Sequence, residues 1–229
     1  ELDPDDPVKS WQVAELYARI GDFDSAHAYE SETSPFDIRY WERRYDDMIE
    51  IGEALTFNPP VELQVWYGLA RAHAAIGNYE TAIYILESTG LPEHAYVDSR
   101  RANGLEAATT LADSLNQQGE VERARELAAW LAEMFSTMSD TGAGDSWWPN
   151  LYEACLLSIL DEDAEALTTL ERVNSSIGLL WYPVLVDAPC FQKFKDDSRY
   201  QAVVRAYVDR LARLRKRLPE TLASFEVND

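Results

Sequence analysis

One short frame, repeated along the chain, constrains its fold more than any other feature of the sequence. The frame begins and ends on alanine and occurs at 14–26, 70–82, 112–124 and 154–166. At the same internal position it carries Gly21, Gly77, Gly119 or Asp161. Glycine favours the left-handed conformation that ends a helix, and residues three and four apart share a helical face. The frame therefore predicts four helix–turn–helix hairpins, whose apolar stripes are buried only when the hairpins stack.

The second frame shows how such a hairpin would pack. Trp66, Leu69 and His73 are spaced to form one inward stripe of the first helix. Ala70 and Ala82 are small enough to let the two helices approach closely. We expect the residue after each turn glycine, Asn78 here and its counterpart Asp22 in the first frame, to cap the following helix.

This pattern resembles the tetratricopeptide repeat (TPR) family over most of residues 8–175. The positions that carry the resemblance in the second repeat are Trp66, Leu69, Ala70, His73, Ala82, Leu86 and Pro92. The resemblance implies an all-α fold, an irregular TPR-like solenoid of helical hairpins. The turns lie farther apart than the roughly 34 residues of the standard repeat. We therefore expect long helices at 98–117 and 121–138 and one extra helix at 35–56, capped by Ser34.

The C-terminal region departs from the repeat. We expect a single continuous domain, with about four hairpins and the extra helix in 1–186 and a capping segment and helix in 187–229. A stripe of apolar residues predicts the inward face of that helix: Val204, Tyr207, Val208, Leu211, Leu214 and Leu218. "SDTGAGDSWWPN" at 139–150 concentrates turn residues and predicts a loop.

The capping segment carries a second resemblance. Its pattern consists of Asp187, Pro189, Phe191, Phe194, Asp197, Arg199 and Tyr200. It is similar to the segment that closes TPR-like C-terminal regions of bacterial multidomain signalling proteins, where such regions follow winged-helix DNA-binding or nucleotide-cyclase domains. We expect Phe191 and Phe194 to be buried and Arg199 to pair with a carboxylate. The chain begins with Glu1 rather than methionine, so we expect a longer natural protein.

Charge excludes some partners. The 41 acidic residues outnumber the 20 Lys and Arg, giving a formal net charge of -21, and nucleic acid would be repelled from this region. No apolar run reaches the ~18 residues of a membrane span, so we expect no membrane insertion. The basic residues at 210–217 are interpreted as favouring a helix C-terminal dipole, or as docking an acidic partner or membrane surface. A cytoplasmic location is expected, or a periplasmic one if a transmembrane segment precedes residue 1.

The sequence predicts neither a cofactor nor a metal. Cys155 and Cys190 are interpreted as small buried hydrophobes, or as a disulfide if the compartment is oxidising. The three histidines, His27, His73 and His94, show no ligand spacing. The acidic clusters are read as solvated turns, and no nucleophile lies near a base, so we expect no catalytic residues.

Binding is the function that the sequence favours. In the family that the chain resembles, the helix face beside the inward stripe lines a concave, peptide-binding groove. Six residues are therefore groove candidates: Tyr67, Arg71, Asp113, Asn116, Gln117 and Trp148. Arg71 is suited to clamp a carboxylate, although the same face is also interpreted as solvated or as packed between helices.

The predicted function is a non-catalytic protein–protein interaction or sensing region of a bacterial signalling protein, with a protein or peptide partner. Homodimer formation stays open. The alternatives are a small-molecule sensor and an enzyme with an unrecognised carboxylate site.

Overall fold

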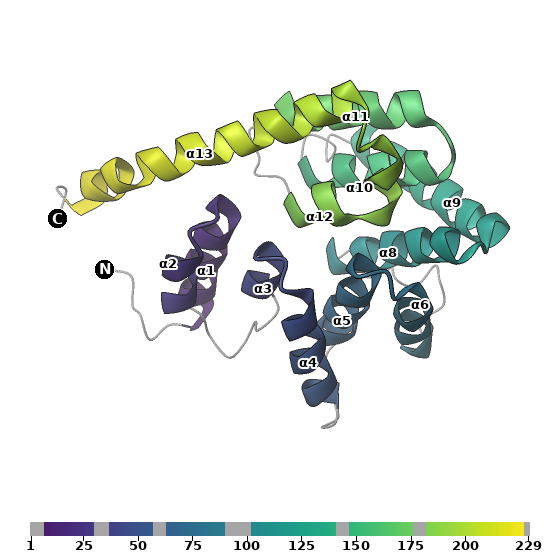
Figure 1. Ribbon diagram of the computed structural model, residues 1–229, viewed down its shortest axis with the longest axis horizontal. Helices are drawn as coiled ribbons and strands as arrows, with labels where there is room; N and C mark the ends of the chain where they lie inside the picture. Colours follow the sequence, from purple (N-terminus) through teal and green to yellow (C-terminus); the bar gives the residue numbers. More distant parts are fainter. Residues whose placement is uncertain are drawn as a thin grey trace.

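The chain folds into helices in every part that the structure describes (Figure 1). The computed structural model describes residues 7–29, 37–56, 63–89, 102–140, 147–175 and 182–226. Within these ranges each regular element is an α-helix or a 3-10 helix. The prediction of an all-α fold is confirmed.

Each of the four repeated frames forms a helical hairpin. The pairs are α1 (Pro7–Ile20) with α2 (Phe23–Ala28), α5 (Leu63–Ala75) with α6 (Tyr79–Ser88), α8 (Ala102–Gln118) with α9 (Val121–Asp140), and α10 (Trp147–Ile159) with α11 (Asp163–Ser175). Gly21, Gly77 and Gly119 have φ of 74°, 86° and 87°, and Asp161 has φ of 63°. The predicted turns are therefore confirmed, and each uses the left-handed conformation that glycine adopts without strain.

The helix caps and helix lengths agree in part with those predicted from the sequence. The Asp22 side chain accepts the Ser25 backbone N–H, whereas Asn78 precedes its helix without a capping side-chain hydrogen bond. Helices α8 and α9 contain 17 and 20 residues, so both are long, as expected, although α8 is described only from Ala102. The loop predicted at 139–150 is too long, because α9 continues to Asp140 and α10 begins at Trp147. Residues 98–101 and 141–146 lie outside the described part of the chain.

The single extra helix predicted at 35–56 is wrong. The segment forms two helices, α3 (Asp37–Trp41) and α4 (Tyr45–Thr56), and the turn between them places Arg43 at φ of 62°. Trp41 packs in a small N-terminal cluster, whereas Met48 packs in the main core. Tyr40 of α3 also packs in the main core, so α3 contributes to both cores and α4 to the main one. Ser34 lies outside the described residues.

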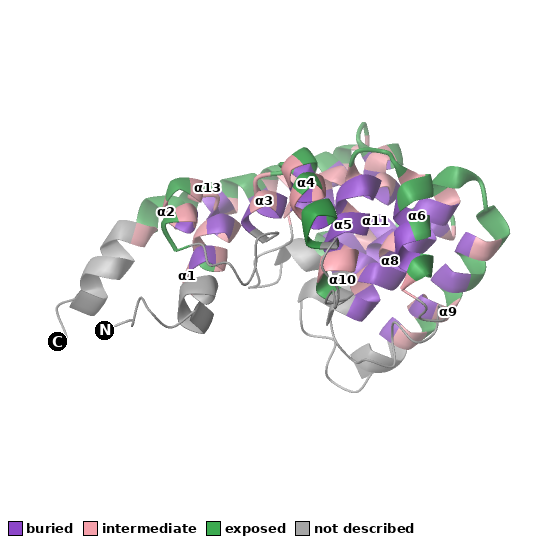
Figure 2. Cartoon of the chain, turned by 90° about the horizontal axis from the view of Figure 1, so that it is seen from below, coloured by how far each residue is buried: buried purple, intermediate pink, exposed green. Residues whose placement is uncertain are grey.

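The first helices of three hairpins lie side by side. Helix α8 packs against both α5 and α10, while α6, α9 and α11 pack against their hairpin partners. Buried residues gather on α5, α8 and α10 (Figure 2). We call the face that these three helices share the inner face. Two short elements of the C-terminal region, α12 (Tyr182–Asp187) and η2 (Pro189–Phe194), lie against it, with η2 contacting α8 and α10. We call residues 182–194 the cover segment.

The last helix, α13 (Ser198–Glu226), spans 29 residues and runs from α11 to α1 (Figure 1). Phe191 and Phe194 are buried, and Arg199 donates to Glu171 at 2.7 Å, as predicted. The predicted stripe holds for Tyr207 and Leu211, but Val208 is 44% exposed. The basic residues at 210–217 lie well before the helix end, so the expected interaction with its C-terminal dipole is wrong, because that effect is confined to the last turn.

The N-terminal hairpin has a small core of its own. This N-terminal cluster consists of Ala14, Ala18, Ala26, Ile38 and Trp41, with partly buried Tyr17, Phe23 and Tyr182 packed against it. Tyr182 also packs against the main core, and α13 contacts α1. The hairpin is thus held to the body by α3, α12 and α13.

Candidate functional site

A small cavity lies between the inner face and the segments that cover it. It has a volume of about 50 Å³. Helices α5, α8 and α10 supply one side of its wall, and α4, the cover segment and the end of α3 supply the other. Its polar wall residues are Tyr40, Tyr45, Arg71, Thr109, Thr110, Asp113, Tyr152 and Asp187. Two of the six groove candidates, Arg71 and Asp113, therefore meet at one site.

Arg71 links three helices beside the cavity. Its Nη1 donates to the Glu106 carboxylate of α8 at 3.2 Å, and its guanidinium carbon lies 3.7 Å from the centroid of the Tyr40 ring. The side chains of Arg71 and Glu106 are only 16% and 12% exposed. Burial raises the pKa of the Tyr40 hydroxyl above its ordinary value, although the Arg71 charge opposes this. A partner's carboxylate would have to compete with Glu106 for Arg71.

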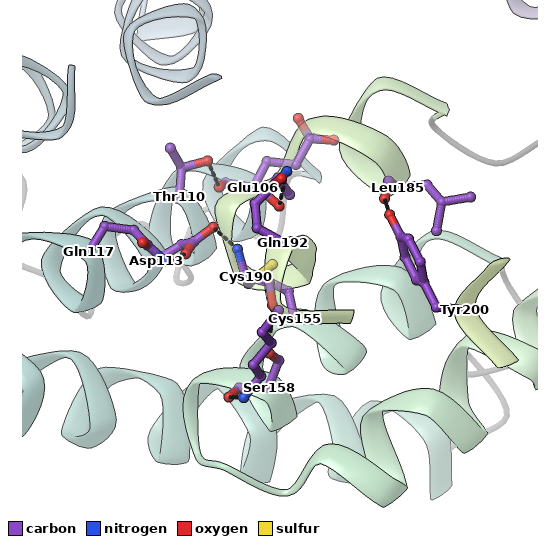
Figure 3. The surroundings of a disulfide bond; sticks show 12 residues. Glu106, Thr110, Asp113, Gln117, Cys155, Ser158, Leu185, Cys190, Gln192 and Tyr200 are labelled. Carbon is purple, nitrogen blue, oxygen red and sulfur yellow. Dashed lines mark hydrogen bonds between the residues drawn. A yellow bond between two sulfur atoms is a disulfide. The ribbon is translucent and has the colours of Figure 1, made fainter. Parts of the chain in front are cut away.

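Asp113 is a buried carboxyl that holds the cover segment (Figure 3). Its Oδ2 accepts the Cys190 backbone N–H at 3.0 Å, and its Oδ1 accepts from Gln117 at 3.3 Å. Burial raises the pKa of Asp113 from 3.8 to about 7, although both hydrogen bonds favour the ionised form. The side chain predicted to face a ligand therefore binds the chain's own backbone.

A disulfide fixes the same contact. Cys155 of α10 is bonded to Cys190 of η2 (Figure 3), and both residues are buried. The Ser158 hydroxyl donates to the Cys190 carbonyl at 2.6 Å, and the Lys193 ammonium donates to the Ser158 carbonyl at 2.7 Å. Burial of both cysteines is as expected, but they form the disulfide that was the less favoured interpretation.

Asp187 anchors the other end of the cover segment. The guanidinium of Arg43 donates to both of its carboxylate oxygens, and the Tyr45 hydroxyl donates to Oδ2 at 2.6 Å. The hydrogen bonds to Asp187 raise the pKa of Arg43, and burial raises that of Tyr45. Sequence reasoning placed Asp187 in the capping pattern but did not foresee its partners, because Arg43 is separated from it by 144 residues.

Three of the remaining groove candidates, Tyr67, Asn116 and Gln117, do not line the cavity. Tyr67 is partly buried on α5, Asn116 is partly buried on α8, and Gln117 is exposed on α8, where it reaches back to Asp113. Trp148 belongs to α10, but its side chain lies outside the described residues.

One wall residue has an unsatisfied hydroxyl. Thr109 is 3% exposed, and its Oγ1 has no hydrogen-bond partner among the residues that the structure describes. A buried hydroxyl without a partner is costly, and a cavity of this size has room for a few water molecules. The cavity therefore offers a few polar groups within a largely apolar lining, and these suit water or the polar end of one side chain.

Three potential metal ligands lie close together at the cavity. The carboxylate of Asp113 and the sulfurs of Cys155 and Cys190 lie within 4.8 Å of one another. The sulfurs are bonded to each other, and a metal binds the thiolate form of cysteine. The disulfide form therefore offers Asp113 alone as a ligand.

Comparisons with known proteins identify no relative. No protein-family model, curated protein or solved structure matches this chain. Among the described helices, none combines the length and the apolar character needed to cross a membrane.

Proposed function

We propose that this chain is a non-catalytic protein–protein interaction or sensing region of a larger bacterial signalling protein, binding a peptide or protein partner on its inner face. The TPR resemblance supports this, and so does the arrangement of α5, α8 and α10. Three adjacent helices present side chains together, which is how stacked helical repeats form extended binding surfaces.

The observation that carries the proposal is the cover segment itself, which lies on the inner face as a bound peptide would. Asp113 of the inner face accepts the Cys190 backbone N–H of this segment, and beside the inner face Arg43 and Tyr45 donate to the Asp187 carboxylate. Charge-assisted, two-pronged contacts of this kind give specificity as well as affinity. The partner we propose is a peptide with an acidic residue, bound beside the cover segment.

The test compares variants of the inner face as bait. Proteins from the source cells are captured on the immobilised chain and quantified by mass spectrometry. Tyr67→Ala and Gln117→Ala change two candidates outside the cavity, and Tyr84→Ala is the matched control, because Tyr84 of α6 is 71% exposed on the second helix of its hairpin.

We expect the control to capture the same partner as the wild type, and the inner-face variants to recover at least about tenfold less, the loss of about 1.4 kcal/mol of binding free energy. Equal recovery by all four proteins would remove the inner face as the binding site. Melting temperatures within about 2 °C of the wild type ensure that the folds are equivalent.

The enzyme alternative has less support than the binding proposal. Asp113 and Asp187 both line the cavity, but each already accepts hydrogen bonds from the chain. Both carboxylates therefore have a structural role, because these bonds hold the cover segment in place. The disulfide favours an oxidising compartment, so of the two expected locations we propose the periplasmic one.

A further inference from the structure

A second pocket lies between the N-terminal hairpin and α13, beside the first residue of the cover segment. It has a volume of about 280 Å³ and is lined from α1, α2, α3, α12 and α13. We call it the α13 pocket. Its volume is near the lower end of the range for small-molecule sites, roughly 300–1,000 Å³. The pocket is much roomier than the cavity on the inner face.

The floor and walls of the α13 pocket are largely apolar and partly aromatic. Trp41 and Phe23 belong to the N-terminal cluster, and Leu211 and Val208 come from α13. Tyr182 adds a ring that stacks on Tyr207, with centroids 5.5 Å apart and planes inclined by 10°. Such a lining favours a ligand with a flat apolar body.

Three arginines also line the α13 pocket. Arg19 donates to Glu15 at 2.6 Å, and Arg43 is held by Asp187. These two guanidinium groups are fixed in place by carboxylates of the chain. The acidic wall residue Glu42 is engaged in turn, since its Oε1 lies 3.0 Å from His27 Nε2 and Arg44 lies near its other oxygen.

Arg215 differs from the other two arginines. Its Nε–H donates to the Ile20 carbonyl at the end of α1, and no described carboxylate lies within ion-pair distance of its guanidinium. A guanidinium has five N–H donors, so most of those of Arg215 remain for a ligand. The guanidinium lies against the turn at Gly21, whose φ of 74° suits glycine. The contact therefore aims a cation without a carboxylate partner at the pocket.

We propose that the α13 pocket binds a small aromatic monocarboxylate, with its carboxylate on Arg215 and its ring against the wall formed by Trp41 and Tyr182. The single negative charge is matched by Arg215, the pocket arginine that has no carboxylate partner among the described residues. A neutral ligand of the same shape would leave that cation unused, and a cationic ligand would be repelled by it. The two sites share α3 and α12, but the carboxylate here is bound by Arg215 of α13, which does not line the cavity on the inner face, so either proposal can fail without the other.

The experiment measures binding of phenylacetate and indole-3-acetate to the full chain by isothermal titration calorimetry and saturation-transfer NMR. Phenylacetamide is the neutral analogue. Arg215→Gln removes the cation, and Arg213→Gln is the matched control, because Arg213 is exposed on the same helix and does not line the pocket. We expect saturable binding of at least one carboxylate, unchanged within twofold by Arg213→Gln and weakened at least about tenfold both by Arg215→Gln and by replacing the carboxylate with the amide.

A third variant fills the pocket from a solvent-exposed position. Val208 lines the pocket and is 44% exposed, so Val208→Trp should abolish carboxylate binding and leave the melting temperature near that of the wild type. The proposal is overturned if neither carboxylate binds saturably, if the amide binds equally well, or if Arg215→Gln or a folded Val208→Trp binds like the wild type.

Discussion

Asp113 shows how one buried side chain links stability to pH. Burial raises its pKa from 3.8 to about 7, so between these values the folded chain keeps a proton that the unfolded chain loses. Stability contributed by Asp113 is therefore present in full below about pH 4, falls as pH rises towards 7, and is constant above that. At about 1.4 kcal/mol per pKa unit, the whole change is up to about 4 kcal/mol.

We predict that Asp113→Asn removes this dependence. Asparagine can still accept the Cys190 N–H, so the contact itself is retained. Urea unfolding from pH 4.5 to 8 measures the unfolding free energy of both proteins. As pH rises, the unfolding free energy of the wild type should fall relative to that of Asp113→Asn. Taking the difference between the two proteins cancels the pH-dependent contributions of other carboxylates. One of these is Glu171, whose pKa is lowered by its hydrogen bond to Arg199. A difference that is constant across this range would contradict the assigned role.

Residues also decide what the sequence could predict. The turns at Gly21, Gly77 and Gly119 were predictable because their signal is local: a residue that readily adopts positive φ stands between two helical stripes. Arg43 adopts the same conformation in the α3–α4 turn, but arginine is not a residue type that indicates a turn, and its hydrogen-bond partner Asp187 lies far away in sequence. The burial of Asp113 was missed for the same reason, because its partner Cys190 is 77 residues away. Helices were predictable, and contacts that cover their faces were not.

At the scale of elements, the disulfide ties η2 to α10 across 35 residues. Closing a loop of that length restricts the unfolded chain, which in the loop-entropy estimate stabilises the fold by about 4 kcal/mol. We predict that reduction lowers the unfolding free energy by roughly this amount and speeds hydrogen exchange of the Cys190 amide. The double variant Cys155→Ser/Cys190→Ser should unfold identically with and without reductant, and equal stability of the oxidised and reduced wild type would exclude a stabilising role.

Helix α4 approaches α5 through a glycine. A Cβ at Gly52 would lie 2.9 Å from Leu69 Cδ1 and 3.3 Å from its Cβ, so a branched side chain has no room without moving the helices. We predict that Gly52→Val lowers the unfolding free energy by about 1–3 kcal/mol, the usual cost of overpacking. Ala54→Val, at an exposed position of the same helix, should cost only its helix propensity, up to about 0.7 kcal/mol. Similar effects of both changes in urea unfolding would mean that the contact relaxes freely.

At the scale of the whole molecule, the described residues form two cores of unequal size, and this predicts unequal local stability. Among the side chains that the structure describes, the N-terminal cluster contains five buried residues, Ala14, Ala18, Ala26, Ile38 and Trp41, three of which are alanines. The main core includes large, completely buried side chains such as Leu115, Leu131 and Phe191. Regions with little buried apolar surface open at lower free energy than the rest of a protein.

We therefore predict that α1–α3 exchange backbone hydrogens faster than α8–α11 in native conditions, as measured by hydrogen-exchange mass spectrometry. Trp41→Ala removes the largest side chain of the N-terminal cluster, a change that typically costs about 3–5 kcal/mol, so exchange in α1–α3 should accelerate strongly. Exchange in α8 should change little, because its amides depend on a core that Trp41 does not enter. Equal acceleration in both regions would instead show that α13 and Tyr182 couple the two cores into one cooperative unit, since these elements are what join them.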